Sequence, residues 1–235
     1  MHHPLESRLE LPSRFQPKGR WARIAHRGNP LAAPGNSRQA VEAALRWPID
    51  AVEADLRRSA DGQWVLAHDP ELSNAFGNRL RIAEHSFSEL AAFFAPQGEL
   101  MTLSDLTDLL RGQAGLLLDL KEPGQAEGAA RSLLELDFTE AVLCGGIGDD
   151  LYRASGLALA TTLGPFWSGR PALEELPSTA VSVYWQHLTS SWMQEAAFFG
   201  LQVLAWTVDE VGSLRALGNL GVQGIISNRL DYLCA

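Results

Sequence analysis

Eight short apolar segments, separated by amphipathic stretches, recur along the chain from Trp21 to its end. Short apolar runs that alternate with longer helical patterns are typical of βαβ units, in which parallel strands form one sheet. Eight such units favour a closed (β/α)8 TIM barrel over an open doubly wound sheet. The expected strands are 24–28, 51–57, 115–122, 141–145, 158–163, 180–185, 202–208 and 224–227.

The stretches between these segments supply the expected helices. Clear helical patterns cover residues 37–47, 103–111, 125–136, 189–199 and 211–220, and weaker ones cover 150–155 and 171–175. A chain of 235 residues, 46% of them hydrophobic, suits one large core. We therefore expect a single (β/α)8 domain over residues 21–235. Residues 1–20 are expected to form a leader that packs on the barrel or frays.

Composition excludes several other kinds of protein. The formal net charge of -9 opposes nucleic-acid binding, which needs clustered lysine and arginine. No apolar stretch is long enough to span a membrane, and the first twenty residues lack the apolar core of a signal peptide. The only cysteines, Cys144 and Cys234, lie far apart in the sequence and do not form a disulfide framework. We therefore expect reduced thiols and a cytoplasmic location, and oligomeric state is left open.

One segment interrupts the alternation after the second expected strand. Asp61-Gly62 is a strong hairpin signal, so this strand is expected to extend past the barrel and fold back as a short insertion. With a two-residue loop, Asp55 would pair with His68, whereas a three-residue loop would shift the pairing by one residue. In either case His68 returns to the neighbourhood of Glu53 and Asp55.

Acidic residues mark the ends of the second and third expected strands. Glu53 and Asp55 are two apart on a strand, so both side chains point to the same face. Asp119 and Lys121 repeat this spacing after another apolar run. Buried carboxylates need a compensating cation, and oxygen ligands without cysteine indicate Mg²⁺ or Ca²⁺. The sequence thus predicts one divalent metal at the active rim of the barrel, with Lys121 beside it.

The first expected strand ends in His26-Arg27-Gly28, which places a histidine and an arginine at the same rim. A histidine titrates near neutral pH and can act as a general acid or base. The planar guanidinium of Arg27 suits a phosphate group. Together with His68 and the acids, these residues predict metal-assisted cleavage of a phosphodiester.

Six short motifs then occur in one order along the chain. They are His26-Arg27-Gly28, Pro34-Gly35-Asn36-Ser37, Glu53-Ala54-Asp55, Asp61-Gly62 through His68-Asp69, Asp119-Leu120-Lys121 and Trp206-Thr207-Val208. In this order they resemble the HRG, PENT, ExD, DG…HD, ExK and WTV motifs of the glycerophosphodiester phosphodiesterases, which are phosphatidylinositol-phospholipase-C-like barrels. The resemblance extends from about Arg23 to Leu233.

The resemblance implies a role for each matching residue. His26 and His68 would be the catalytic acid/base pair, and Glu53, Asp55 and Asp119 the metal ligands. Arg27 and Lys121 would bind the phosphate, and Trp206 would flank the substrate. The family reaction converts a glycerophosphodiester, a small-molecule substrate, to glycerol 3-phosphate and an alcohol. Either water or the neighbouring glycerol hydroxyl would be the nucleophile.

Four features depart from the family pattern: Gly35 replaces an acid, Asp119 replaces Glu, Asn228 replaces Asp, and Cys144-Gly145-Gly146 lacks the polar-aromatic ending common on the fourth strand. The first three favour an alternative in which a weakened barrel binds phosphodiesters without efficient turnover. A sugar-phosphate isomerase or aldolase and a lipid-active phospholipase are further alternatives. Phe166, Trp167, Tyr184 and Trp185 are candidates for the wall of a pocket for the alcohol.

Overall fold

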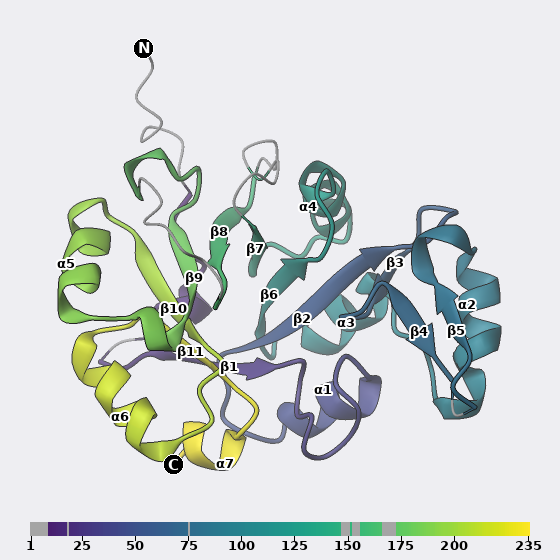
Figure 1. The fold of residues 1–235 in the computed structure, drawn as a ribbon, viewed down its shortest axis with the longest axis horizontal. Helices are drawn as coiled ribbons and strands as arrows, with labels where there is room; N and C mark the ends of the chain where they lie inside the picture. Colours follow the sequence, from purple (N-terminus) through teal and green to yellow (C-terminus); the bar gives the residue numbers. More distant parts are fainter. Residues whose placement is uncertain (1–8, 18, 75, 147–150, 152–155, 166–172) are drawn as a thin grey trace.

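Eight parallel strands close into a barrel in the computed structural model (Figure 1). The structure describes residues 9–17, 19–74, 76–146, 151, 156–165 and 173–235. Around the barrel the strand order is β1, β2, β6, β7, β8, β9, β10 and β11, and β11 pairs with β1 to close it. The predicted TIM barrel is therefore confirmed.

The observed strands agree closely with the expected segments. They are β1 (Ala22–His26), β2 (Ala51–Arg58), β6 (Gly115–Leu120), β7 (Ala141–Gly146), β8 (Ala158–Leu163), β9 (Ala180–Tyr184), β10 (Gln202–Trp206) and β11 (Gly224–Ser227). No strand end differs by more than two residues, and most of the differences are at the carboxyl ends. The first strand stops at His26 because Arg27 and Gly28 have φ values of 53° and 81°, which extended backbone does not allow.

Helices follow most strands and surround the barrel (Figure 1). They are α1 (Arg38–Ala44), α3 (Leu103–Leu110), α4 (Ala126–Glu135), α5 (Ser190–Phe198), α6 (Val211–Leu220) and α7 (Leu230–Leu233). The weak prediction at 150–155 falls outside the described residues except for Leu151. The other weak prediction covers 171–175, and residues 171 and 172 also lie outside the described residues. The rest of that segment, Leu173–Glu175, is one 3₁₀ turn rather than an α-helix.

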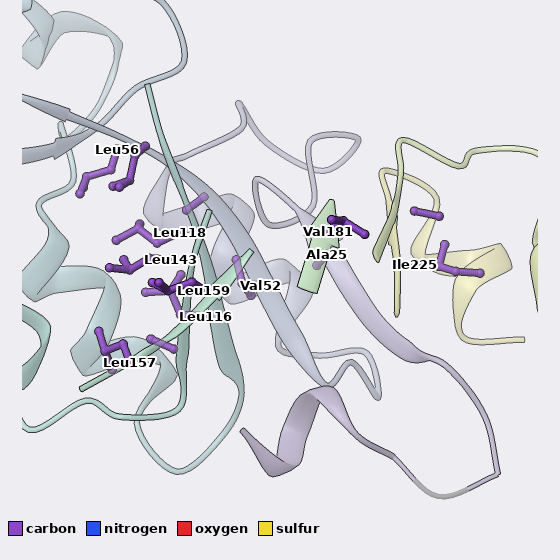
Figure 2. Close-up of a cluster of buried hydrophobic side chains, with 14 of the residues drawn as sticks. Ala25, Val52, Leu56, Leu116, Leu118, Leu143, Leu157, Leu159, Val181 and Ile225 are labelled. Atoms are coloured by element: carbon purple, nitrogen blue, oxygen red, sulfur yellow. The ribbon is translucent and has the colours of Figure 1, made fainter. Parts of the chain in front are cut away.

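Side chains on the outer faces of the strands form the larger core, between barrel and helices. Figure 2 shows part of it, in which leucines of β6, β7 and β8 pack beside Val52 and Leu56 of β2. Successive strand residues point to opposite faces, so the alternate residues point into the barrel. At the amino ends of the strands the barrel interior is filled by apolar side chains. Leu11 and Phe15 of the N-terminal segment pack against these side chains and close that end of the barrel. A side chain at Gly115 would lie 2.9 Å from the Phe15 ring.

The insertion after β2 stands beside the barrel, beyond the far end of that strand (Figure 1). It contains β3 (Trp64–Leu66), β4 (Glu71–Ser73), β5 (Arg79–Arg81) and α2 (Phe87–Phe94), with 3₁₀ turns at Ile82–Glu84 and Ala95–Gln97. Its apolar side chains form a small core of their own.

The hairpin register differs by one residue from the two-residue-loop prediction. β2 pairs with β3 so that Arg58 faces Trp64 and Leu56 faces Leu66. The loop has three residues, because Ser59 and Gln63 still share a backbone hydrogen bond and Gly62 takes a φ of 88°. Asp55 therefore lies opposite Ala67, whose N–H donates to the Asp55 carbonyl, and His68 lies one residue further on.

Within the described residues, no helix has both the length and the apolar character needed to cross a membrane.

Candidate active site

Charged side chains gather where the carboxyl ends of β1, β2 and β6 meet. The predicted residues His26, Arg27, Glu53, Asp55, His68, Asp119, Lys121 and Trp206 all line one inner pocket of about 230 Å³. The parallel strands place these positions side by side, since His26 is opposite Glu53 and Asp55 is opposite Asp119. The structure therefore brings every predicted site residue together.

Three carboxylates form the centre of this pocket. One oxygen each from Glu53, Asp55 and Asp119 lies within 4.8 Å of the others, an arrangement that can hold a metal ion. Asp55 is fully buried, and Glu53 is 5% exposed. Burial and the neighbouring carboxylates raise the pKa of Glu53 well above its usual range. Burial also raises the pKa of Asp119. The three carboxylates therefore need positive charge nearby to be ionised together.

Lys121 provides part of that charge. Its Nζ lies 2.5 Å from Asp119 and 2.7 Å from Asp55. Burial alone would lower the pKa of Lys121, but the two carboxylates outweigh it and raise the pKa to about 12. The same ammonium and Arg27 lower the pKa of Asp55 against the effect of its own burial. Lys121 is therefore cationic at neutral pH.

Arg27 is held in the site by its backbone as well as its side chain. Its N–H donates to Glu53 Oε2 at 3.0 Å, and its Nε lies 2.8 Å from Asp55 Oδ2. The latter contact is a close ion pair rather than an aligned hydrogen bond, because its geometry leaves Nε without a hydrogen-bond partner among the described residues. A Cβ at Gly35 would lie 3.0 Å from Arg27 Cβ. The glycine therefore leaves the room in which the arginine side chain lies.

Asn36 is a site residue to which the sequence analysis assigned no role. Its Nδ2 donates to Asp55 Oδ2 at 2.7 Å, and its Oδ1 accepts from the Asp55 N–H at 3.1 Å. The cap of α1 is Ser37, whose hydroxyl accepts from the Ala40 N–H. The Asn-Ser pair in the PENT-like motif was the signal that could have assigned Asn36 to the site.

His26 is oriented by Asn228, one of the departures from the family pattern. Its Nδ1 lies 2.7 Å from Asn228 Oδ1, and Asn228 Nδ2 donates to Asp209 Oδ2 at 2.7 Å. A carboxylate accepts hydrogen bonds only, so the amide NH₂ faces Asp209 and the amide oxygen faces His26. The Nδ1 of His26 therefore carries the proton, and Nε2 presents a lone pair to the pocket. Burial and then Arg27 lower the pKa of His26, so the ring is neutral at pH 7.

His68 approaches the pocket from the insertion and is exposed. Its Nδ1 lies 2.8 Å from Asp69 Oδ1. Its carbonyl oxygen accepts two hydrogen bonds from the Arg57 guanidinium, at 3.0 and 2.8 Å.

Arg57 was not identified from the sequence, although its contacts reach both sides of the site. The residue is 8% exposed, and its Nη1 lies 2.7 Å from Glu122 Oε1. Glu122 follows Lys121 directly. Arg57 thus connects the backbone of His68 to the segment that carries Lys121. An arginine in an apolar strand pattern was the available signal.

Trp206 lies at the end of β10 and lines the pocket on the side of the barrel opposite β2 and β6. Its ring meets that of Tyr184 edge-on, with centroids 5.8 Å apart. Of the other predicted aromatics, Phe166 and Trp167 lie outside the described residues, and Trp185 packs against the outer core. A wider groove of about 790 Å³ begins at His26, Arg27 and His68 and runs between the β1–α1 loop and the insertion.

Comparison with known proteins agrees with the motifs. The model of the glycerophosphoryl diester phosphodiesterase family matches residues 26–126. The chain is 22% identical to the glycerophosphodiester phosphodiesterase of Caldanaerobacter subterraneus over 89% of this chain and 95% of the relative. The predicted resemblance is therefore confirmed.

Solved structures share the fold. An Oleispira antarctica phosphodiesterase in complex with the product sn-glycerol-3-phosphate superposes with a TM-score of 0.76 at 21% identity, over 95% of this chain and 98% of that one. The glycerophosphodiester phosphodiesterase from Thermotoga maritima gives 0.76 at 20% identity, over 90% and 96%.

Proposed function

We propose that this relative of the glycerophosphodiester phosphodiesterases hydrolyses glycerophosphodiesters to glycerol 3-phosphate and an alcohol, with His26 and His68 as the acid/base pair. The observation that carries the proposal is their placement: both histidines line the pocket that contains the three-carboxylate cluster, Arg27 and Lys121. In this proposal residues 21–235 act as a single catalytic domain in the cytoplasm, on a small-molecule substrate.

The donor set fits a divalent metal such as Mg²⁺ or Ca²⁺. Three carboxylates face two cations, so the cluster has one negative charge in excess when all are ionised. Asp55 Oδ1 is buried and has no aligned hydrogen bond among the described residues. Glu53, Asp55 and Asp119 would hold the ion, which when bound would neutralise charge on the phosphoryl oxygens.

The residues of the chain would divide the remaining tasks. Arg27 and Lys121 flank the acids and would bind the phosphate oxygens. Nε2 of His26 has a lone pair and would accept a proton from the attacking hydroxyl, either water or the neighbouring glycerol hydroxyl. His68 stands where the inner pocket meets the groove, and would protonate the leaving alcohol there.

Turnover of glycerophosphocholine by the wild type and by the variants His26→Ala and His68→Ala tests this assignment. Each variant should lose about 10²–10⁴-fold in kcat, the usual contribution of one acid/base residue. The control is His85→Ala, because the His85 ring hydrogen-bonds to the Arg81 carbonyl in the insertion and does not line the pocket. Wild-type turnover by both site variants would refute the two-histidine mechanism.

Binding without turnover is the second candidate, favoured by Gly35 and by the shorter Asp119. An assay for glycerol 3-phosphate release with added Mg²⁺, Ca²⁺ or Mn²⁺ and an EDTA control separates the two. The proposed hydrolase releases product only with metal. The binding protein retains glycerophosphocholine in equilibrium dialysis and releases none under any condition.

A further inference from the structure

Asp209 is an acid that lines neither the inner pocket nor the groove, and it lies three residues after β10 ends at Trp206. Its carboxylate accepts three hydrogen bonds from the chain at the end of β11. The donors are the Ser227 hydroxyl at 3.0 Å, the Asn228 N–H at 2.8 Å and Asn228 Nδ2 at 2.7 Å. An ionised carboxylate only accepts hydrogen bonds, so the direction of each of these three is fixed.

The two oxygens of this carboxylate have different partners. Oδ1 accepts from the Ser227 hydroxyl and from the Asn228 N–H. The Ser227 oxygen in turn accepts from the Arg229 N–H at 3.0 Å, so its own proton is directed at Asp209. Because a backbone N–H cannot turn, an acceptor is needed at the position of Oδ1. Oδ2 accepts from the Asn228 side chain, and therefore holds the NH₂ of that amide away from His26.

The orientation of the Asn228 amide decides which nitrogen of the His26 ring carries the proton. The amide Oδ1 lies 2.7 Å from His26 Nδ1, and an amide oxygen only accepts. The proton is therefore on Nδ1, and Nε2 keeps a lone pair. The opposite orientation would place the NH₂ against Nδ1 and the ring proton on Nε2. An amide alone can take either orientation, so the choice depends on Asp209.

We propose that Asp209 is a positioning residue, which acts through the Asn228 amide to keep the proton of the neutral His26 ring on Nδ1. This inference rests on the proposed function and deepens it, since Nε2 is the atom that would accept a proton from the attacking hydroxyl. It also gives a reason for one departure from the family pattern. The acid that the pattern has at residue 228 lies one hydrogen bond further back in this chain, at Asp209.

The variant Asp209→Asn should reverse the tautomer. The oxygen of the new amide has to stay at the position of Oδ1, where the Asn228 N–H needs an acceptor. Its NH₂ then replaces Oδ2 and faces Asn228 Nδ2. Two donors cannot bond, so the Asn228 amide turns over and presents its NH₂ to His26 Nδ1. The kcat for release of glycerol 3-phosphate from glycerophosphocholine should fall by between about tenfold and the roughly 10⁴-fold that a wrong tautomer costs a catalytic histidine.

The double variant Asp209→Asn/Asn228→Asp exchanges the two side chains and should restore the native tautomer. The carboxylate at residue 228 then accepts from the amide at residue 209 and from His26 Nδ1. Most of the lost kcat should return. Asn228→Asp alone places two carboxylates against each other and should also lower kcat. Because the exchanged side chains are nearly equal in size, recovery in the double variant reports hydrogen-bond direction rather than packing.

Two-bond ¹⁵N–¹H NMR spectra of the histidine rings, recorded with Mg²⁺ present, report the tautomer without turnover. The variant His26→Ala identifies the signals of His26 by their absence. The matched control is Glu210→Gln, because Glu210 is the adjacent acid and its carboxylate accepts from Ser213 at 3.4 Å. This control should keep both the native tautomer and the wild-type kcat. Urea denaturation of each variant checks that it is folded.

A proton on Nε2 in the wild type, or on Nδ1 in Asp209→Asn, would overturn the proposal. A double variant that keeps the reversed tautomer would overturn it as well. The native tautomer in every variant, with product release by the wild type, refutes the role of Asp209 and leaves the proposed function in place. A tautomer that follows Asp209, in a wild type that releases no product, supports the role of Asp209 and refutes the hydrolase.

Discussion

The side chain of Arg57 contacts the backbone of His68, and we propose that it positions the imidazole of that residue for catalysis. It holds the His68 carbonyl with two hydrogen bonds and pairs with Glu122. We expect Arg57→Lys, which keeps the charge but lacks the planar fork, to reduce kcat about tenfold, and Arg57→Met to reduce it about 10²-fold. A displacement of about 1 Å at a reacting group costs this much. KM should change little, because Arg27 and Lys121, the proposed phosphate-binding residues, remain.

Steady-state kinetics on glycerophosphocholine, with urea denaturation of each variant, check this prediction. Arg58→Met is the control, because Arg58 is the exposed neighbour and packs over Trp64. Partial recovery in the lysine variant is the signature of positioning. A change in KM alone, or the same loss of kcat in Arg58→Met, would contradict it.

At this scale the sequence predicts the charged residues that line the pocket but not the residues that position them. Histidines and acids at strand ends can be predicted as site residues, because strand periodicity and the barrel fold place their side chains at one rim. Asn36, Arg57 and Asp209 act through hydrogen bonds between elements distant in the chain. Such hydrogen bonds require atomic positions that are accurate to a few tenths of an ångström. Residue spacing along the sequence does not give positions with that accuracy.

The loop between β1 and α1 depends on a single glycine. Gly28 has a φ of 81°, and a Cβ there would lie 2.7 Å from the Ala40 backbone. Gly28→Ala should therefore lower the free energy of unfolding by about 2–5 kcal/mol, the sum of left-handed strain and a clash with backbone. It should also lower kcat, because Arg27 precedes it.

Gly112→Ala separates the left-handed backbone strain from the steric clash. Gly112 has a φ of 73°, and no atom lies within 4 Å of the position that its Cβ would take. Strain alone should cost about 1–2 kcal/mol and leave turnover unchanged. Urea denaturation measures both variants. Equal losses in the two would show that close packing against α1 contributes nothing.

The elements themselves follow from the sequence more completely than their pairing does. Strand positions agree because β-rich apolar runs have sharp limits, and β8 and β11 match the expected 158–163 and 224–227. The hairpin register does not agree with its first prediction, because Asp61-Gly62 suits both two- and three-residue loops. The three-residue loop forms because Gly62 adopts a left-handed conformation and its N–H donates to the Ser59 carbonyl. The resulting one-residue shift changes which residue lies opposite Asp55.

Across the whole molecule, the interior of the barrel changes from apolar at the amino ends of the strands to charged at their carboxyl ends. Leu11 and Phe15 close the apolar end, and the candidate site occupies the other. Sequence periodicity predicts this polarity, because inward positions can be read along each strand. The closure by Phe15 was not predictable, since an isolated aromatic in a proline-rich leader has no periodic context.

The apolar end is also where pH should act on stability. Asp50 precedes β2 and accepts hydrogen bonds from Arg20 at 2.6 and 2.7 Å and from the Arg23 N–H at 2.8 Å. Burial alone would raise the pKa of Asp50, but these contacts outweigh it and lower the pKa. The stabilisation is therefore complete above the unfolded pKa of about 3.9. It is lost as the pH falls through the lower folded value.

Asp50→Asn should consequently lower the free energy of unfolding by about 1–2 kcal/mol at pH 7, because hydrogen bonds to charged groups contribute about 1.5–3 kcal/mol and the partial exposure of Arg20 reduces that contribution. The difference from the wild type should shrink as the pH is lowered from 4 toward 2, because protonation of Asp50 then removes the same interaction from the wild type. Urea denaturation along this pH series measures it. Asp231→Asn, which removes an exposed acid paired with Arg229, should change stability little at any pH. A pH-independent difference for Asp50→Asn would mean that packing, rather than the ionised carboxylate, ties the N-terminal segment to the barrel.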